Sequence, residues 1–149
     1  MTGLANPSGC VFCQIAAGAI PAEVVLDDEF SLAFLDHRPL FPGHCLLIPK
    51  GHIETLPDLP ATLRAPLFTN ASLLAQAMEE GIQAEGSFVA INNRVSQSVP
   101  HLHVHVVPRR KKDGLRGFFW PRQRYQDDAE LHRMGDLLRA SVARLKGVM

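Results

Sequence analysis

Short apolar runs separated by turn-forming residues predict an antiparallel β-sheet. Runs at 23–26 and 30–35 flank an acidic turn, a pattern typical of a β-hairpin. A third strand is expected at 44–49, after a loop with two prolines, and a fourth at 87–92. In a fifth segment, 101–106, histidine and aliphatic residues strictly alternate, which is the period of an extended strand.

Three other segments have helical spacing. A short helix is expected at 10–17, and a final one at 127–148. A longer helical pattern runs over 58–85, but Pro66 within it predicts a break or a later start. The residues expected to face the core are Leu63, Leu67, Ala71, Leu74, Met78 and Ile82 in the long segment and Leu131, Met134, Leu138, Val142 and Leu145 in the last. The pattern predicts an α+β fold.

The alternating segment also indicates chemistry. His101, His103 and His105 share one strand face, where they present three groups that titrate near neutral pH. Two neighbouring histidines could converge on a metal, but recruiting all three requires the strand to bend. A row of imidazoles along an extended anionic substrate is the more natural use, with the middle histidine attacking and a flanking one moving a proton. The alternative is a histidine-rich surface strand without function.

The pair Cys10-x-x-Cys13 has three interpretations. Thioredoxin-like redox chemistry would place it after a strand of a βαβ unit, which this sequence does not predict. A zinc site needs two further ligands, for which the chain offers His37, His44, His52 and the three alternating histidines. Two buried, inert thiols are the third possibility.

Composition bounds the class of protein. The chain has 149 residues, enough for one domain with a hydrophobic core; 46% are apolar, 20% are charged and the formal net charge is zero. Neither nucleic acid nor a membrane is therefore indicated as a partner. Without a signal-peptide pattern, a cytoplasmic protein is expected. We expect a flexible lead-in at 1–9, a core at 10–109, and a basic arm with the final helix at 110–149.

The segment His101-Leu102-His103-Val104-His105-Val106-Val107 resembles the signature of the histidine triad (HIT) family of nucleotide hydrolases and transferases. Landmarks that precede it in order extend the resemblance: Cys10-Val11-Phe12-Cys13-Gln14-Ile15, Ile20-Pro21-Ala22-Glu23, Leu32-Ala33-Phe34-Leu35-Asp36, Pro42-Gly43-His44 and Ile48-Pro49-Lys50-Gly51-His52. The resemblance implies an antiparallel sheet of about five strands with two main helices in one domain, usually as a homodimer.

It also implies roles for individual residues. His103 corresponds to the nucleophile that attacks the α-phosphorus of a bound nucleotide, and His105 to a residue that contacts the α-phosphate. His44 corresponds to a histidine that orients the nucleophile, and Ser98 to a hydroxyl at the leaving group. The residues that correspond to substrate-binding positions are Asp36 at the ribose, Phe12, Ile15, Phe34 and His37 around the base, and Asn92 and Gln97 near the phosphate.

In family members with a Cys-x-x-Cys pair, the resemblance implies a structural zinc. Here its ligands would be Cys10, Cys13, His52 and His101. Catalysis would need neither this metal nor an organic cofactor.

The function that the resemblance implies is hydrolysis or transfer at the α-phosphate of a nucleoside phosphoramidate or dinucleoside polyphosphate. It would pass through a nucleotidyl-histidine and release a nucleoside monophosphate. The alternative is a purine-nucleotide-binding regulatory module with incidental turnover. One departure concerns the tight connection 93–96, which stands where many relatives have a glycine-bearing loop.

Overall fold

The computed structural model describes residues 9–115 and 122–147, which form two compact units. The first unit ends at Asp113, and the second begins at Gly114 and contains the last helix. We describe each unit by itself. The expected flexible lead-in lies outside the described residues except for Gly9, and so does part of the basic arm.

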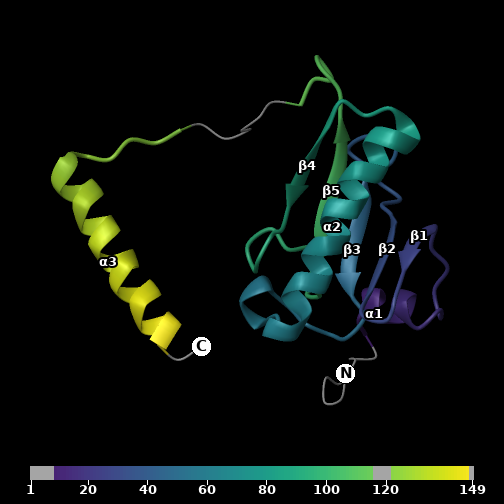
Figure 1. The fold of residues 1–149 in the computed structure, drawn as a ribbon, viewed down its shortest axis with the longest axis horizontal. Coiled ribbons are helices and arrows are strands. Elements are labelled where there is room, and N and C mark those ends of the chain that lie inside the picture. Colours follow the sequence, from purple (N-terminus) through teal and green to yellow (C-terminus); the bar gives the residue numbers. More distant parts are fainter. Residues whose placement is uncertain (1–8, 116–121, 148–149) are drawn as a thin grey trace. The chain divides into compact units, whose positions relative to one another are not determined.

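A five-stranded antiparallel sheet forms the frame of the first unit (Figure 1). The strands are β1 (Val24–Asp27), β2 (Ser31–Leu35), β3 (Cys45–Pro49), β4 (Gly86–Ala90) and β5 (Val104–Arg109). Their order across the sheet is β1-β2-β3-β5-β4, so β5 lies between two strands that both precede it in the chain. The predicted sheet and its hairpin are confirmed.

Two long helices, a short one and a 3-10 turn complete the described chain. They are α1 (Val11–Ala16), η1 (Leu56–Asp58), α2 (Ala61–Ile82) and α3 (Asp128–Gly147). The predicted α+β class with two main helices is therefore confirmed. The expected interruption at Pro66 is wrong, because α2 runs through it without a break. Pro66 removes only the hydrogen bond to the carbonyl of Thr62, an exposed residue in the first turn, where water can replace it.

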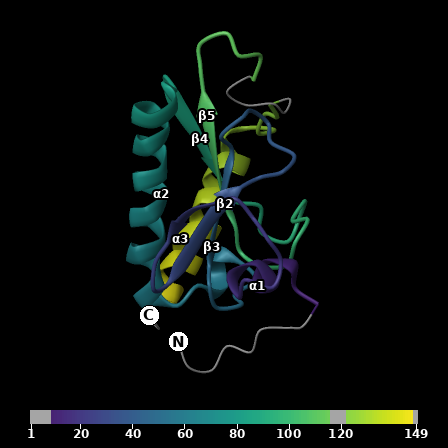
Figure 2. The same ribbon diagram turned by 90° about the vertical axis from the view of Figure 1, so that its right-hand side faces the viewer.

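The two faces of the sheet carry different layers (Figure 2). On one face, α2 packs its buried residues, such as Leu67 and Leu74, against Leu47, Leu102 and Val104. On the other face, α1 packs against alternate residues of β2 and β3. This second cluster consists of Cys10, Phe12 and Cys13 from α1 and its N-cap, and of Leu32, Phe34, Leu46 and Ile48 from the strands. Because side chains alternate along each strand, the predicted separation of Leu102, Val104 and Val106 from the histidines is met.

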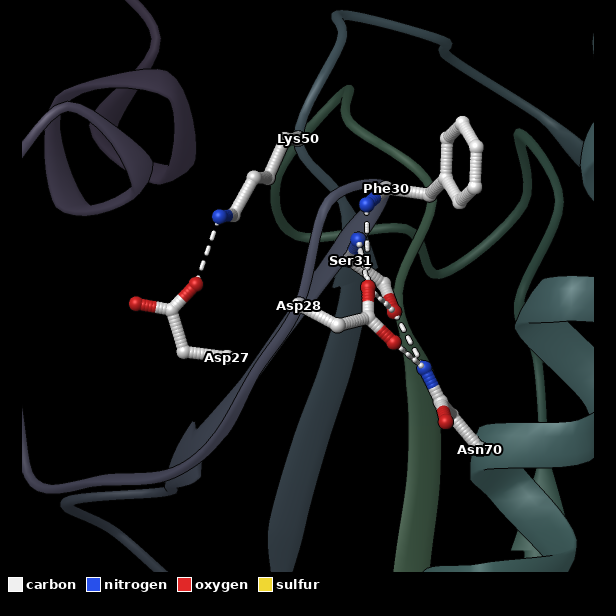
Figure 3. A network of polar contacts seen from close by, with 6 residues as sticks. All are labelled: Asp27, Asp28, Phe30, Ser31, Lys50 and Asn70. Atoms are coloured by element: carbon white, nitrogen blue, oxygen red, sulfur yellow. Dashed lines mark hydrogen bonds and ion pairs between the residues drawn. The ribbon is translucent and has the colours of Figure 1, made fainter.

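A polar network fastens the β1–β2 hairpin to α2 (Figure 3). The buried Asn70 amide donates to Asp28 Oδ2 and to Ser31 Oγ, both at 2.6 Å. Asp28 Oδ1 accepts from the backbone amides of Phe30 and Ser31, each at 2.9 Å. Burial raises the pKa of Asp28, but these hydrogen bonds outweigh it and leave the pKa below its ordinary value. The turn therefore holds an ionised carboxylate.

The loop after β5 begins the predicted basic arm. Arg109 Nε donates to Asp113 Oδ2 at 2.6 Å, and Arg110 Nη2 donates at 2.6 Å to the carbonyl of Ile82 at the end of α2. A cation at that end of the helix also offsets the helix dipole. These two arginines therefore have partners within the first unit. Within 9–115 and 122–147, no helix has the combination of length and hydropathy that membrane crossing requires.

The second unit contains the predicted C-terminal helix as α3, but none of its side chains is buried. We expected Leu131, Leu138 and Val142 to face a core; their exposed fractions are 44%, 66% and 51%. Within its own unit α3 has no core to face, and the inward orientation of these side chains stays a prediction.

Candidate functional site

The three alternating histidines lie at and just before the start of β5, an interior strand of the sheet, on the face that α1 covers. β5 begins at Val104, so His101 and His103 precede it, whereas we expected all three histidines within one strand. The segment is nevertheless fixed, because the Leu102 amide donates to the carbonyl of Ile53 at 2.7 Å. The rings of neighbouring histidines consequently lie close together, with the centroids of His103 and His105 5.0 Å apart.

The hydrogen bonds of His103 define its reactive nitrogen. Its Nδ1 lies 2.7 Å from the carbonyl oxygen of His101. A carbonyl only accepts, so the proton must be on Nδ1, and Nε2 of the neutral ring keeps a free lone pair. The ring of Phe12 meets His103 edge to face at 5.1 Å, and His103 is only 3% exposed. The site therefore presents one oriented imidazole nitrogen that can act as a nucleophile.

His44 contacts a different histidine from the one expected. Its Nε2 lies 3.0 Å from His105 Nδ1, whereas the backbone carbonyl of His101 holds His103. In this structure His44 thus contacts His105 and not His103, because His44 precedes β3 and the β3–β5 pairing sets Leu46 opposite His105. No side-chain pattern could reveal a main-chain acceptor such as the carbonyl of His101.

A chain of hydrogen bonds also fixes the tautomers of His44 and His105. The Leu40 amide donates to His44 Nδ1 at 3.1 Å, so the proton of neutral His44 is on Nε2. That proton is donated to His105 Nδ1, which leaves the His105 proton on its own Nε2. The half-buried imidazole of His105 can thus donate a hydrogen bond to an anion.

Asp36 extends this chain and forms a possible three-ligand set with the two histidines. Its Oδ2 lies 3.8 Å from His44 Nε2, and its Oδ1 accepts from the Arg38 amide at 2.9 Å. One ligand atom from each of Asp36, His44 and His105 falls within 4.8 Å of the others. A cation on His44 Nε2 would require the proton on Nδ1, where the Leu40 amide already donates. The His44–His105 pair is therefore built as a hydrogen-bonded relay with the Asp36 carboxylate close by, not as a metal site.

A second cluster has the geometry of a metal site. Cys10 Sγ and Cys13 Sγ lie 3.3 and 3.4 Å from His101 Nδ1, and Cys13 Sγ lies 3.3 Å from His52 Nδ1. Zinc bonds of about 2.3 Å to sulfur and 2.0–2.1 Å to nitrogen imply an S···N separation of roughly 3.5 Å in a tetrahedron. All four ligand atoms fall within 4.8 Å of one another, so Cys10, Cys13, His52 and His101 fit zinc.

The surroundings of this cluster agree with metal binding, in contrast to those of His44. The far nitrogen of His101, Nε2, lies 2.8 Å from the carbonyl of Pro49, and that of His52 lies 3.9 Å from Glu54 Oε1. The Pro49 carbonyl holds the His101 proton on Nε2 and directs the lone pair of its Nδ1 at the thiols. Burial raises the pKa of Cys13 to about 12, so a cation has to displace a thiol proton.

The segment between β4 and β5 is a long loop over 91–103. We expected a strand to residue 92 and a tight connection, but β4 ends at Ala90. Gln97 holds the loop: its Oε1 accepts from the Arg94 amide at 2.7 Å and its Nε2 donates to the carbonyl of Glu54 at 2.6 Å. Asn93 adds a bond from the Leu56 amide at 2.8 Å, which the sequence analysis missed. These contacts stabilise positive φ angles of 69° at Arg94 and 60° at Ser96 without glycine.

The remaining expected substrate residues are dispersed around the histidines. Ser98 and Asn92 are exposed on the 91–103 loop, and Ser98 lines a hollow of about 410 Å³ that also reaches His52 and Glu54. Phe12 and Phe34 are buried and meet edge to face at 5.5 Å. Ile15 packs half-buried against the same cluster, and His37 is exposed beside Asp36.

The buried histidines predict acid-sensitive stability. Burial, together with the charges of His103 and His44, lowers the pKa of His105 to about 4. Below pH 6.5, His105 is protonated in the unfolded chain but stays neutral in the folded protein. Protonation therefore stabilises only the unfolded state, and the unfolding free energy should fall by up to about 1.4 kcal/mol per pH unit until pH 4. Urea unfolding between pH 7.5 and 4.5 should show this loss, and His105→Gln should make it shallower. The same slope in His105→Gln and the wild type would contradict the assignment; exposed His132→Gln is the control.

Comparison with known proteins places these residues in context. Residues 17–112 match the HIT domain. The adenosine 5'-monophosphoramidase HNT1 of Saccharomyces cerevisiae is 32% identical over 94% of this chain and 85% of its own. The adenylylsulfatase HINT3 of Arabidopsis thaliana is 33% identical over 71% of this chain, and the asymmetrical bis(5'-nucleosyl)-tetraphosphatase of Schizosaccharomyces pombe is 35% identical over 72%. The matched region spans only 55% and 58% of those two relatives.

Solved structures agree with the fold. A HIT family protein from Bacillus subtilis superposes with a TM-score of 0.80 at 34% identity, over 89% of this chain and 96% of that one. A zinc-bound histidine triad protein from Mycobacterium smegmatis has a TM-score of 0.69 at 39% identity, over 95% of this chain and 98% of that one.

Proposed function

This chain belongs to the HIT family of hydrolases, and we propose that it cleaves nucleoside 5'-phosphoryl compounds at the α-phosphate through a nucleotidyl-His103 intermediate. The observation that carries the proposal is the bond between His103 Nδ1 and the carbonyl of His101, which leaves Nε2 free to attack. The substrate would be a nucleoside phosphoramidate or a dinucleoside polyphosphate. These classes share the reacting centre and differ in the leaving group.

In the first step, His103 Nε2 forms a bond to the α-phosphorus, and the bond from phosphorus to the leaving group breaks. The attacking imidazole becomes positively charged while Nδ1–H stays hydrogen-bonded to His101, whose carbonyl stabilises that charge. The leaving group departs with the electron pair of the broken bond and takes a proton from the solvent or from the site. The oriented nitrogen thus replaces a weaker nucleophile, water.

In the second step, water attacks the same phosphorus and gives up a proton to the solvent, while the P–N bond breaks and returns its electron pair to Nε2, which releases a nucleoside monophosphate and restores neutral His103. The Nε2–H of His105 is suited to donate to a non-bridging α-phosphate oxygen in both steps. Asp36 would accept from the ribose hydroxyls, and the exposed hydroxyl of Ser98 would meet the leaving group. Phe12, Ile15 and Phe34 would form the apolar floor below the base.

We further propose a structural zinc held by the Cys10, Cys13, His52 and His101 cluster. When bound, it would supply a crosslink between the start of α1 and the segment before β5, without entering the reaction. His101 has two functions in this arrangement. Its Nδ1 faces the thiols, while its carbonyl accepts from the nucleophile. The metal site would therefore position His103 through a single residue.

A purine-nucleotide-binding module with incidental turnover is the second candidate. The oriented lone pair of His103 favours a catalytic function over binding alone. Binding requires hydrogen-bond donors to phosphate, but it does not require a nucleophile that the His101 carbonyl holds in one orientation.

The test is to trap the intermediate. The protein is mixed with adenosine 5'-phosphoramidate, quenched in base within milliseconds to seconds, and digested for mass spectrometry. We expect an adenylyl group on the peptide that contains His103, together with AMP in solution. AMP release without any adduct across the quench times would indicate either that the adduct is hydrolysed faster than it forms or that water attacks directly. Nucleotide binding without AMP release would support the binding module.

A further inference from the structure

The thiols of Cys10 and Cys13 have a geometry that suits a second chemistry besides metal binding. Both sulfurs lie beside one ring nitrogen, with Cys10 Sγ 3.3 Å and Cys13 Sγ 3.4 Å from His101 Nδ1. The backbone amide of Cys13 donates to Cys10 Sγ at 3.3 Å, which holds the Cys10 side chain over the first turn of α1. The two sulfurs therefore lie within 4.8 Å of each other.

The backbone at this turn permits a covalent bond between the two sulfurs. Residues three apart in a helical turn have Cα atoms roughly 5 Å apart. Disulfides join residues whose Cα atoms are roughly 4.4–6.8 Å apart, so this spacing is suitable. The third thiol, Cys45, is buried in the other hydrophobic cluster, where it donates to the carbonyl of Gly43 at 3.3 Å. Cys10 and Cys13 are therefore the pair that can react with each other.

Cys10 is the thiol that an oxidant can reach first. Of the two sulfur-bearing residues, only Cys10 is among the described residues that line the hollow of about 410 Å³. The Pro49 carbonyl holds the proton of His101 on Nε2, so the lone pair of Nδ1 faces the thiols. This nitrogen can accept the proton that leaves Cys10 when its sulfur attacks.

From this geometry we propose that Cys10 and Cys13 are a thiol oxidation site, at which hydrogen peroxide converts the pair into an internal disulfide that a dithiol reductant reverses. Cys10 Sγ attacks one peroxide oxygen, the O–O bond breaks, and Cys10 becomes a sulfenic acid while the other oxygen leaves as water. Cys13 Sγ then attacks the Cys10 sulfur, the S–O bond breaks, and a second water leaves. Two thiols lose two electrons and two protons, and one peroxide is reduced to two waters.

The disulfide and the proposed metal site exclude each other, because a cysteine binds a metal through its thiolate. In the oxidised pair both sulfurs are bonded within one turn, and the link from α1 to His52 and His101 is lost. Phe12 lies between the two cysteines and meets the ring of His103 edge to face at 5.1 Å. Oxidation should therefore also disturb the packing of the nucleophile. This last effect rests on the proposed function, whereas the disulfide itself does not.

Peptide mapping of the full-length protein tests the oxidation directly. Reduced protein is stripped of metal with a chelator, treated with hydrogen peroxide, denatured, and alkylated at its remaining thiols. Cleavage after Glu23 separates the peptide that contains Cys10 and Cys13 from Cys45. We expect this peptide to lose two hydrogen atoms and to escape alkylation, while Cys45 is alkylated. Dithiothreitol should restore all three thiols.

Two variants and a folding measurement complete this test. Cys45→Ala is the matched control and should form the same disulfide at the wild-type rate. Cys13→Ser should stop at a sulfenic or sulfinic acid on Cys10. Circular dichroism checks that the wild type stays folded during oxidation. Wild-type thiols that remain open to alkylation would mean that the pair is inert and would overturn the inference, as would a disulfide to Cys45 or between two chains.

Metal content and turnover measure the consequences of oxidation. Peroxide treatment of zinc-loaded protein should lower the zinc content by at least about tenfold. It should also lower kcat/KM for adenosine 5'-phosphoramidate by at least about tenfold, with recovery after dithiothreitol and zinc. Equal turnover of the oxidised and reduced proteins would overturn the coupling through Phe12. Reduced protein without zinc or without turnover would refute the proposed metal site or the proposed function, while the peptide map still decides whether the disulfide forms.

Discussion

Replacement of His103 by alanine should lower kcat/KM for adenosine 5'-phosphoramidate by on the order of 10⁴, with the loss in kcat. The reason is that Nε2 of His103 is the nitrogen whose lone pair is left free by the His101 carbonyl. His105 cannot replace it, because its own Nε2 carries the proton. Steady-state kinetics with purified variants, together with the adduct measurement, test this expectation.

The matched control is His132→Ala, which removes an exposed histidine of α3. It should retain wild-type kinetics. His103→Ala should keep the wild-type melting temperature within a few degrees and the wild-type zinc content, since its side chain is absent from the four-ligand cluster. A His103→Ala enzyme that keeps more than a tenth of the wild-type kcat would exclude His103 as the nucleophile.

Loss of the metal cluster should have the largest effect on stability. We expect Cys13→Ser, or treatment with a strong chelator, to lower the unfolding free energy by at least about 3 kcal/mol, because a metal that binds only the folded state stabilises it. The measurements are zinc content by elemental analysis and urea unfolding before and after treatment. The control is Cys45→Ala, which alters a buried thiol outside the cluster and should keep the zinc.

The same experiment tests whether the cluster positions the nucleophile. Nitrogen-15 NMR of the histidine rings should show His103 as a single Nδ1–H tautomer in the zinc-loaded protein. Removal of zinc should produce a mixture, because the His101 carbonyl is then held less firmly. Wild-type stability in Cys13→Ser would contradict a structural metal. An unchanged tautomer after zinc removal would contradict the positioning role alone.

The sequence analysis succeeded where period and turn chemistry act locally. The alternation at 101–106 correctly separated the histidines from Leu102, Val104 and Val106, because one face of the strand must pack on α2. The hairpin around Asp28 followed from its acidic turn, which the structure explains by backbone amides that donate to the carboxylate. Both features depend on neighbours in the sequence.

The failures concern interactions between distant segments or with main-chain atoms. The partner of His44 depends on the register between β3 and β5, which no local pattern specifies. The 91–103 loop has no glycine at its positive φ angles, so the sequence carried no turn signal for a loop of this length. Side-chain hydrogen bonds of Gln97 and Asn93 stabilise it instead. The packing of α3 could not be predicted either, because an amphipathic pattern predicts an apolar face without saying what packs on it.

The position of β5 in the sheet also affects how quickly the protein can fold. The His44–His105 contact joins residues 61 apart, and the Cys10–His101 contact joins residues 91 apart. Closing such long loops costs entropy before any contact compensates for it, which slows folding. The hairpin of β1 and β2 and the helix α2 can form early from local contacts, whereas β5 must insert between two strands already present in the chain. The site is therefore complete only once β5 has paired with β3 and the segment before β5 has met α1.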